Sequence, residues 1–175
     1  FLTVVLLALG VLVANAQIGQ DPGVSGNLFP VGVSNSAFDR PSPNGIYTLW
    51  DLDDREAPGR FTWLYWVDGG GVMRGNPPQG PLVSALEENI LDTTRSGFWR
   101  VGDWVHGNPG ANFQPALDEL ECRINNTNCP PGVTLVPTVT IPIYDRARPN
   151  GNSLTLRIAG LGTFRLVCAR SSLTH

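Results

Sequence analysis

The chain opens with a mostly apolar segment, residues 1–16, that contains no charged side chain. A run of this kind predicts one helix over residues 2–16, about 22–25 Å long, which is short for a lone membrane span. The segment also resembles the apolar centre of a secretory signal and ends in the small-x-small pattern of Ala14, Asn15 and Ala16. If it is retained, we expect it to be buried in a membrane or in the core of a polymer. The predicted assembly helix includes Phe1, Val5, Ala8, Gly10 and Ala14, and the small residues among them would allow helices to approach closely.

The pattern changes after this segment. Residues 17–30 are rich in Gly, Pro, Ser and Asn, with Asp21, Pro22 and Gly23 as a turn signal, and we expect them to form a connector. Residues 31–175 predict a β-rich globular head. Within it, segments 46–50 and 61–67 are rich in the aromatic and branched side chains that strands favour.

The later part of the head predicts further strands and a hairpin. Apolar residues alternate with Thr and Pro from Val133 to Ile143, which predicts a half-buried strand interrupted at Pro137. The Asn-Gly-Asn sequence at 150–152 predicts a hairpin turn. Two more strands are expected at 154–158 and 164–168, and apolar spacing predicts short helices at 81–91 and 115–124. The expected fold class is mainly β, a β-sandwich-like head with two short helices, plus an N-terminal apolar α-helix.

The charge balance narrows the classes of partner. A net charge of −3 and a pI of about 5.2 argue against nucleic acid. All 12 basic residues are arginine, which suits packed contacts better than lysine does, although genomic bias explains this equally well. Charged residues make up 15% of the chain, against roughly 25% in ordinary soluble domains. Such a neutral surface suggests cover by other protein or by glycan, or an extracellular β-domain with a polar surface.

Three cysteines indicate the compartment. Cys122 and Cys129 are spaced too widely for a CxxC redox motif and have no neighbouring histidine for a zinc site. In an exported chain, a local disulfide between them is the natural interpretation. Cys168 is in phase with apolar neighbours and is expected to be a buried free thiol.

The sequence offers little catalytic chemistry. His106 has no nucleophile elbow to serve, so a surface-loop histidine is the simpler interpretation. The acidic group Asp51, Asp53 and Asp54 is a weak calcium candidate, because it lacks the glycine and the later glutamate of an EF-hand, and a solvated loop is the alternative. No cofactor is expected.

Two surface features remain open. Asn125 begins an Asn-Asn-Thr sequon inside the Cys122–Cys129 loop and is a glycosylation candidate if the producing cell has the machinery. Five tryptophans are many for this length, and we expect them in the core or in subunit contacts rather than in a sugar site. They are Trp50, Trp63, Trp66, Trp99 and Trp104.

The head also contains an ordered series of short blocks. They are FPVGV at 29–33, GIYTLWD at 45–51, PGRFTWL at 58–64, VGDWVHGNPG at 101–110, TIPIYD at 140–145, GNS at 151–153 and IAGLGTFRL at 158–166. In this order they resemble the extracytoplasmic part of Tad/Flp pilus-assembly proteins of the TadE/TadG-like kind, over about residues 29–168.

The resemblance implies a pilin-like subunit of an extracellular bacterial filament, made as an inner-membrane-anchored precursor. Its implied partners are copies of itself in a helical homopolymer and the pilus assembly machinery in the membrane. A leader cut before an apolar helix, often at Phe, fits Phe1, but Val5 stands where such pilins carry a glutamate. We therefore expect a structural subunit, not an enzyme. The alternative is an exported, monomeric β-domain that binds carbohydrate or hydrolyses a surface polymer.

Overall fold

The computed structural model describes residues 2–8, 26–39, 46–51, 60–64, 66, 83–108, 116–150 and 153–171. Within these residues the protein is mainly β with two short α-helices, as predicted. The strands are β1 (Leu2–Ala8), β2 (Val31–Ser34), β3 (Ile46–Asp51), β4 (Arg60–Leu64), β5 (Trp104–Asn108), β6 (Thr138–Asn150) and β7 (Ser153–Ser171). The helices are α1 (Val83–Leu91) and α2 (Leu117–Asn125), with 3₁₀ turns η1 (Asn35–Phe38) and η2 (Thr93–Ser96).

The described strands belong to one mixed sheet instead of the two packed sheets of a sandwich. Their order is β1-β3-β4-β2-β6-β7-β5, and additional pairings of β1 with β7 and of β4 with β5 close the sheet on itself. The pairs β2–β6 and β3–β4 are parallel, and the other pairs are antiparallel. Closure removes open edges, which is how barrel-like sheets avoid unpaired backbone groups.

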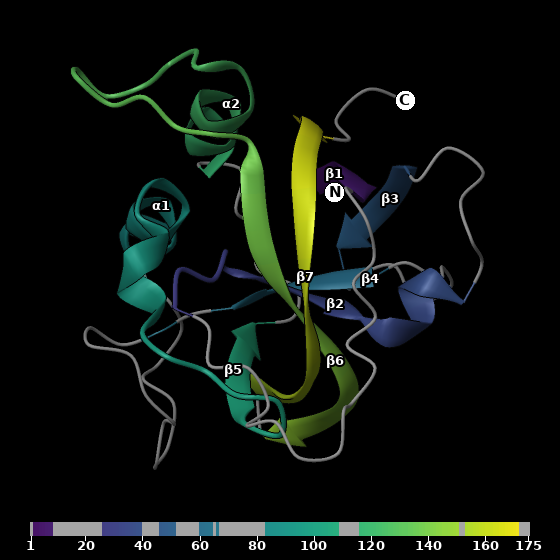
Figure 1. The fold of residues 1–175 in the computed structure, drawn as a ribbon. Coiled ribbons are helices and arrows are strands. Elements are labelled where there is room, and N and C mark those ends of the chain that lie inside the picture. Colours follow the sequence, from purple (N-terminus) through teal and green to yellow (C-terminus); the bar gives the residue numbers. More distant parts are fainter. Residues whose placement is uncertain are drawn as a thin grey trace.

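The two longest strands, β6 with 13 residues and β7 with 19, form a hairpin that crosses the middle of the view in Figure 1. Asn150 pairs with Ser153, so the predicted hairpin is confirmed. The strand starting at residue 133 was placed too early, because β6 begins at Thr138, just after Pro137. The register shifts on both sides of Tyr144, and such bulges bend a hairpin and help a sheet to curl.

The two strands expected at 154–158 and 164–168 are one continuous strand, β7, which runs through residues 159–163. Gly160 pairs with Ile143, and Gly162 pairs with Ile141. A Cβ on Gly162 would lie 2.5 Å from the Phe164 ring, so glycine there makes room for a core side chain. Gly162 therefore serves packing inside a strand rather than a turn, whereas a side chain at Gly160 would meet no neighbour within 4 Å.

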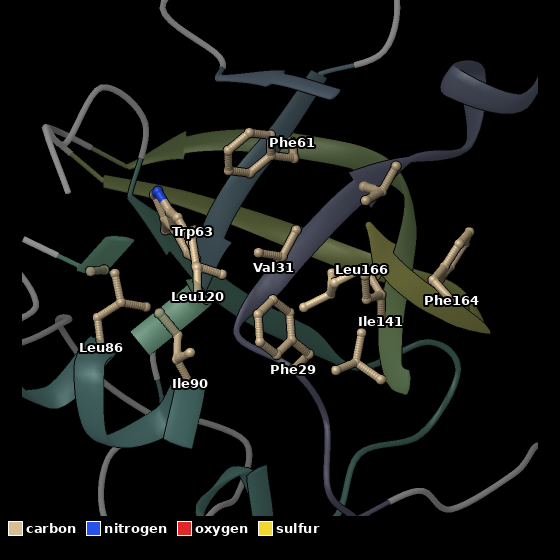
Figure 2. Close-up of a cluster of buried hydrophobic side chains, with 13 residues drawn as sticks. Phe29, Val31, Phe61, Trp63, Leu86, Ile90, Leu120, Ile141, Phe164 and Leu166 are labelled. Carbon is tan, nitrogen blue, oxygen red and sulfur yellow. The ribbon is translucent and has the colours of Figure 1, made fainter. Parts of the chain in front are cut away.

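The two helices pack on each other, and α2 packs on β7 beside the start of β6 (Figure 1). They cover a core to which α1 contributes Leu86 and Ile90 and α2 contributes Leu120 (Figure 2). The sheet supplies Phe61 and Trp63, whose rings meet edge to face at 5.4 Å. Trp63, Trp66 and Trp99 are all buried, in agreement with the core or interface role predicted for the tryptophans.

The N-terminal segment differs from its prediction. Leu2–Ala8 form strand β1, antiparallel to both β3 and β7, where a helix was predicted, and residues 9–16 lie outside the described residues. The branched residues Thr3, Val4 and Val5 favour extended backbone, and both neighbouring strands supply backbone partners.

The end of the expected connector also belongs to the body of the domain. Leu28 and Phe29 are fully buried. The Phe29 N–H donates to the Thr140 carbonyl at 2.8 Å, and the Leu28 N–H donates to the Ser96 hydroxyl at 2.9 Å. The packed head thus begins before residue 31.

Candidate functional site

The closure strand β1 holds part of the predicted assembly segment. Val5 and Ala8 lie in it, whereas Phe1, Gly10 and Ala14 lie outside the described residues. Val5 pairs with Thr48 of β3 on one side and with Cys168 of β7 on the other. An apolar strand bonded on both sides is thus the element that joins the two ends of the sheet.

The predicted disulfide is confirmed. Cys122 and Cys129 are bonded, with their Cα atoms 4.7 Å apart. Cys168 is free, as predicted, and is half-buried rather than fully buried. A disulfide is typical of an oxidising environment such as the outside of a cell.

Arg123, beside this disulfide, is a buried cation that sequence reasoning missed. Its Nε donates to the Ile90 carbonyl at 2.7 Å, and its two Nη atoms donate to the carbonyls of Leu91 at 3.1 Å and Val136 at 3.2 Å. The guanidinium also lies 5.8 Å from the centroid of the Phe29 ring. Burial lowers the pKa of Arg123 from its ordinary value, and the Asp92 carboxylate partly opposes this. The side chain satisfies carbonyls at the end of α1, which have no partner within the helix.

The candidate glycosylation site is accessible. Asn125 is the last residue of α2 and is exposed, as is Thr127. Asn126 between them takes left-handed backbone with φ of 55°, and its side-chain oxygen accepts from the Leu135 N–H at 3.0 Å. The sequon therefore lies on an exposed turn held by the disulfide.

The structure also bears on the two weak candidates for chemistry, His106 and the acidic group at residues 51–54. His106 is 4% exposed in strand β5, so the surface-loop interpretation was wrong, and burial lowers its pKa and favours the neutral ring. Asp51 ends β3, but its side chain, with Asp53 and Asp54, lies outside the description. In the part of the chain that the structure describes, no three metal-ligating side chains come together.

The structure also shows a basic face on strands β5, β7 and β6 that the sequence analysis did not predict. Arg146 pairs with Arg157 of β7, and Arg157 pairs with Trp104 of β5. Arg148 lies two residues beyond Arg146, and its guanidinium stands 4.2 Å from the centroid of the Trp104 ring. Asp145 accepts from Arg157 Nε at 2.9 Å and also pairs with its Nη2. The Arg-x-Arg spacing on a strand was the available signal, but only register unites it with Arg157 and Trp104.

Comparison with protein-family models, curated proteins and solved structures finds no match to this chain. Among the described helices, none has the length and apolar character needed to span a bilayer.

Proposed function

We propose that this protein is a structural subunit of an extracellular bacterial filament, with a β-rich head displayed for surface contact and no catalytic role. Each copy would join the next through its N-terminal apolar segment. The resemblance to TadE/TadG-like proteins supports this assignment, and the disulfide fits an exported chain.

The position of β1 carries the proposal. This strand is uncharged, and it pairs with β3 and β7 along its length. The chain between Ala8 and Gly26 could span roughly 60 Å if fully extended, more than the width of a domain of this size. A copy could therefore place its β1 in the β3–β7 gap of a neighbour and form the same backbone hydrogen bonds. Exchange of this kind is a low-cost route to oligomers, and a head-to-tail form of it builds open filaments.

The structure also bears on the alternative of a carbohydrate-binding monomer. The tryptophan-rich strands were the evidence for a carbohydrate site. Trp63, however, is only 1% exposed and packs against Phe61. A ring in that position supports a core role and has no open face for a sugar.

Cys168 allows a direct test of the exchange. Val5 and Cys168 are partners across an antiparallel pair, where Cα atoms lie about 4.5–5.5 Å apart, a separation that a disulfide can bridge. Oxidised Val5→Cys protein, run without reducing agent, should give a ladder of covalent oligomers. A cross-linked monomer alone would show that β1 stays in its own chain and would overturn the proposal.

The matched control is Leu7→Cys, whose partner on β7 is Arg165 and carries no thiol. It should give no ladder. Failure of Val5→Cys to form any cross-link would contradict the β1–β7 pairing itself. Deletion of residues 1–16 should abolish filaments in negative-stain images, and filaments built from the truncated head would also refute the assembly role.

A further inference from the structure

The outer face of the β5–β7–β6 strands concentrates positive charge on a chain whose net charge is −3. Residues directly opposite each other on antiparallel strands share a face, so Arg146, Arg157 and Trp104 lie in one row. The alternate row contains Val105 and Leu156, both buried in the core. Arg146 and Arg148 are exposed and the Arg157 side chain is 31% exposed, so the arginine row faces outward.

The guanidinium groups on this face are held in place. Trp104 lies under the Arg148 guanidinium at 4.2 Å, and stacking of this kind orients the planar group. The Asp145 carboxylate accepts hydrogen bonds from two nitrogens of Arg157, Nε and Nη2. Arg146 and Arg148 are exposed, and among the described residues no hydrogen-bond acceptor occupies their side chains. Three guanidinium charges thus face one carboxylate, which leaves donors available to a ligand.

We infer that this face binds a carboxylated polysaccharide. The guanidinium fork matches the two oxygens of a carboxylate and binds it more specifically than a point charge does. Arg146 and Arg148 are two residues apart on one strand, about 6.6–6.8 Å, so successive carboxylates of an extended chain could meet successive arginines. The inference rests on the proposed function for the display of the head outside the cell, where such polymers occur.

Two other negatively charged partners, single-stranded nucleic acid and an anionic membrane surface, fit the face less well. Single-stranded nucleic acid is usually bound by open aromatic rings on which bases stack, but Arg148 covers the Trp104 ring. A membrane surface is usually met by protruding apolar side chains. The exposed large apolar residues of the described chain are Phe98, Val136 and Val167, and none belongs to the arginine row.

The test measures binding of polygalacturonate to the full-length protein by titration calorimetry. We expect saturable binding that weakens with added salt, and a loss of at least ~10-fold in affinity for the Arg146→Ala/Arg148→Ala double variant. Arg148→Lys keeps the charge but loses the fork and the stacked plane, and should also weaken binding. Arg165→Ala removes an exposed arginine from the same strand β7 outside this face, and should bind as the unaltered protein does.

Competing ligands decide the class of polymer. Fully methyl-esterified polygalacturonate, single-stranded DNA and phosphatidylserine vesicles should each bind at least ~10-fold more weakly than the acid form, because they lack carboxylates in this spacing. Equal or tighter binding of DNA or vesicles, dependent on Arg146 and Arg148, would replace the polysaccharide with that partner. Absence of polygalacturonate binding, or an equal loss with Arg165→Ala, would overturn the inference.

The result is separable from filament assembly. A Val5→Cys ladder without polygalacturonate binding would refute only the ligand. Binding that depends on the arginine row, combined with cross-linked monomers alone, would refute only the strand exchange.

Discussion

Arg123, on the helical side of the molecule, and Arg148, on the outer face of the hairpin, carry the same guanidinium in opposite surroundings. Arg123 is 4% exposed, and its donors are used by carbonyls of Ile90, Leu91 and Val136. Arg148 is exposed and leans on the Trp104 ring. Burial keeps the first guanidinium away from a ligand, and the second is an oriented cation in water.

The comparison separates stability from recognition. A buried cation is costly to desolvate, so its hydrogen bonds must be complete, and removal exposes the groups that it satisfied. An exposed arginine contributes little to folding, because water already solvates both the native and the unfolded state. Mutations at the two places should therefore have effects of different kinds and sizes.

The largest expected effect is at Arg123. Arg123→Met keeps much of the volume but leaves three carbonyls without their donor, and should lower the free energy of unfolding by about 3–5 kcal/mol. Urea denaturation followed by tryptophan fluorescence measures this. Arg165→Met, at an exposed position, should stay within about 0.5 kcal/mol. If Arg123→Met lowered the free energy of unfolding by less than about 1 kcal/mol, the hydrogen bonds of the buried guanidinium would not be a main source of stability.

Next in size is the disulfide that closes the chain around Arg123. Reduction of Cys122–Cys129 should lower stability by about 2–3 kcal/mol in the chain-entropy account of a short loop. Unfolding curves with and without reductant give the value, and peptide mapping without reduction should find the two cysteines linked. Recovery of Cys168 bridged to either would contradict the observed pairing.

The smallest expected effects are on the pH dependence of stability. Removing one carboxylate in each region should change the stability at pH 7 with opposite signs. On α2, burial and then the Glu87 and Asp118 carboxylates raise the pKa of Glu119 above its ordinary 4.5. Its contribution to stability is therefore fully present below pH 4.5 and is lost as pH rises through the raised pKa. Glu119→Gln should stabilise the protein at pH 7, by less than about 1 kcal/mol, and the gain should vanish in acid.

On the hairpin, the hydrogen bonds from Arg157 hold the pKa of Asp145 below its ordinary 3.8. Its stabilising contribution is present above pH 3.8 and is lost as pH falls through the lowered pKa. Asp145→Asn should therefore destabilise slightly at pH 7 and make no difference in strong acid. Unfolding midpoints of both variants from strong acid up to pH 7 test the pair, and effects of the same sign at pH 7 would contradict the contrast.

Local pattern predicted much of the fold. The aromatic and branched segments became β3 and β4, and the Asn-Gly-Asn signal became the β6–β7 turn. Helix α1 lies within its predicted range, and α2 ends one residue beyond its predicted end. These features depend on backbone preference and apolar period, which act over a few residues. The disulfide was predictable for the same reason, because Cys122 and Cys129 are close in the chain.

The errors arose where a partner distant in the chain decides the outcome. An apolar run such as Leu2–Ala8 can be helix or strand, and β3 and β7, with backbone groups to pair, make it a strand. Two strands were expected at 154–158 and 164–168, but the pairing of Gly160 with Ile143 and of Gly162 with Ile141 keeps β7 continuous. Propensity is a weak prior beside such pairing.

By itself, the sequence determined a mainly β chain with two short helices, a local disulfide and an uncharged apolar start. Tertiary structure alone decided that the sheet closes through β1 and that Arg123 is buried. It also brought Trp104 beside arginines more than forty residues away in the chain. The physical reason is that strand register and burial depend on contacts between segments far apart in sequence, and no local pattern records which segments will meet.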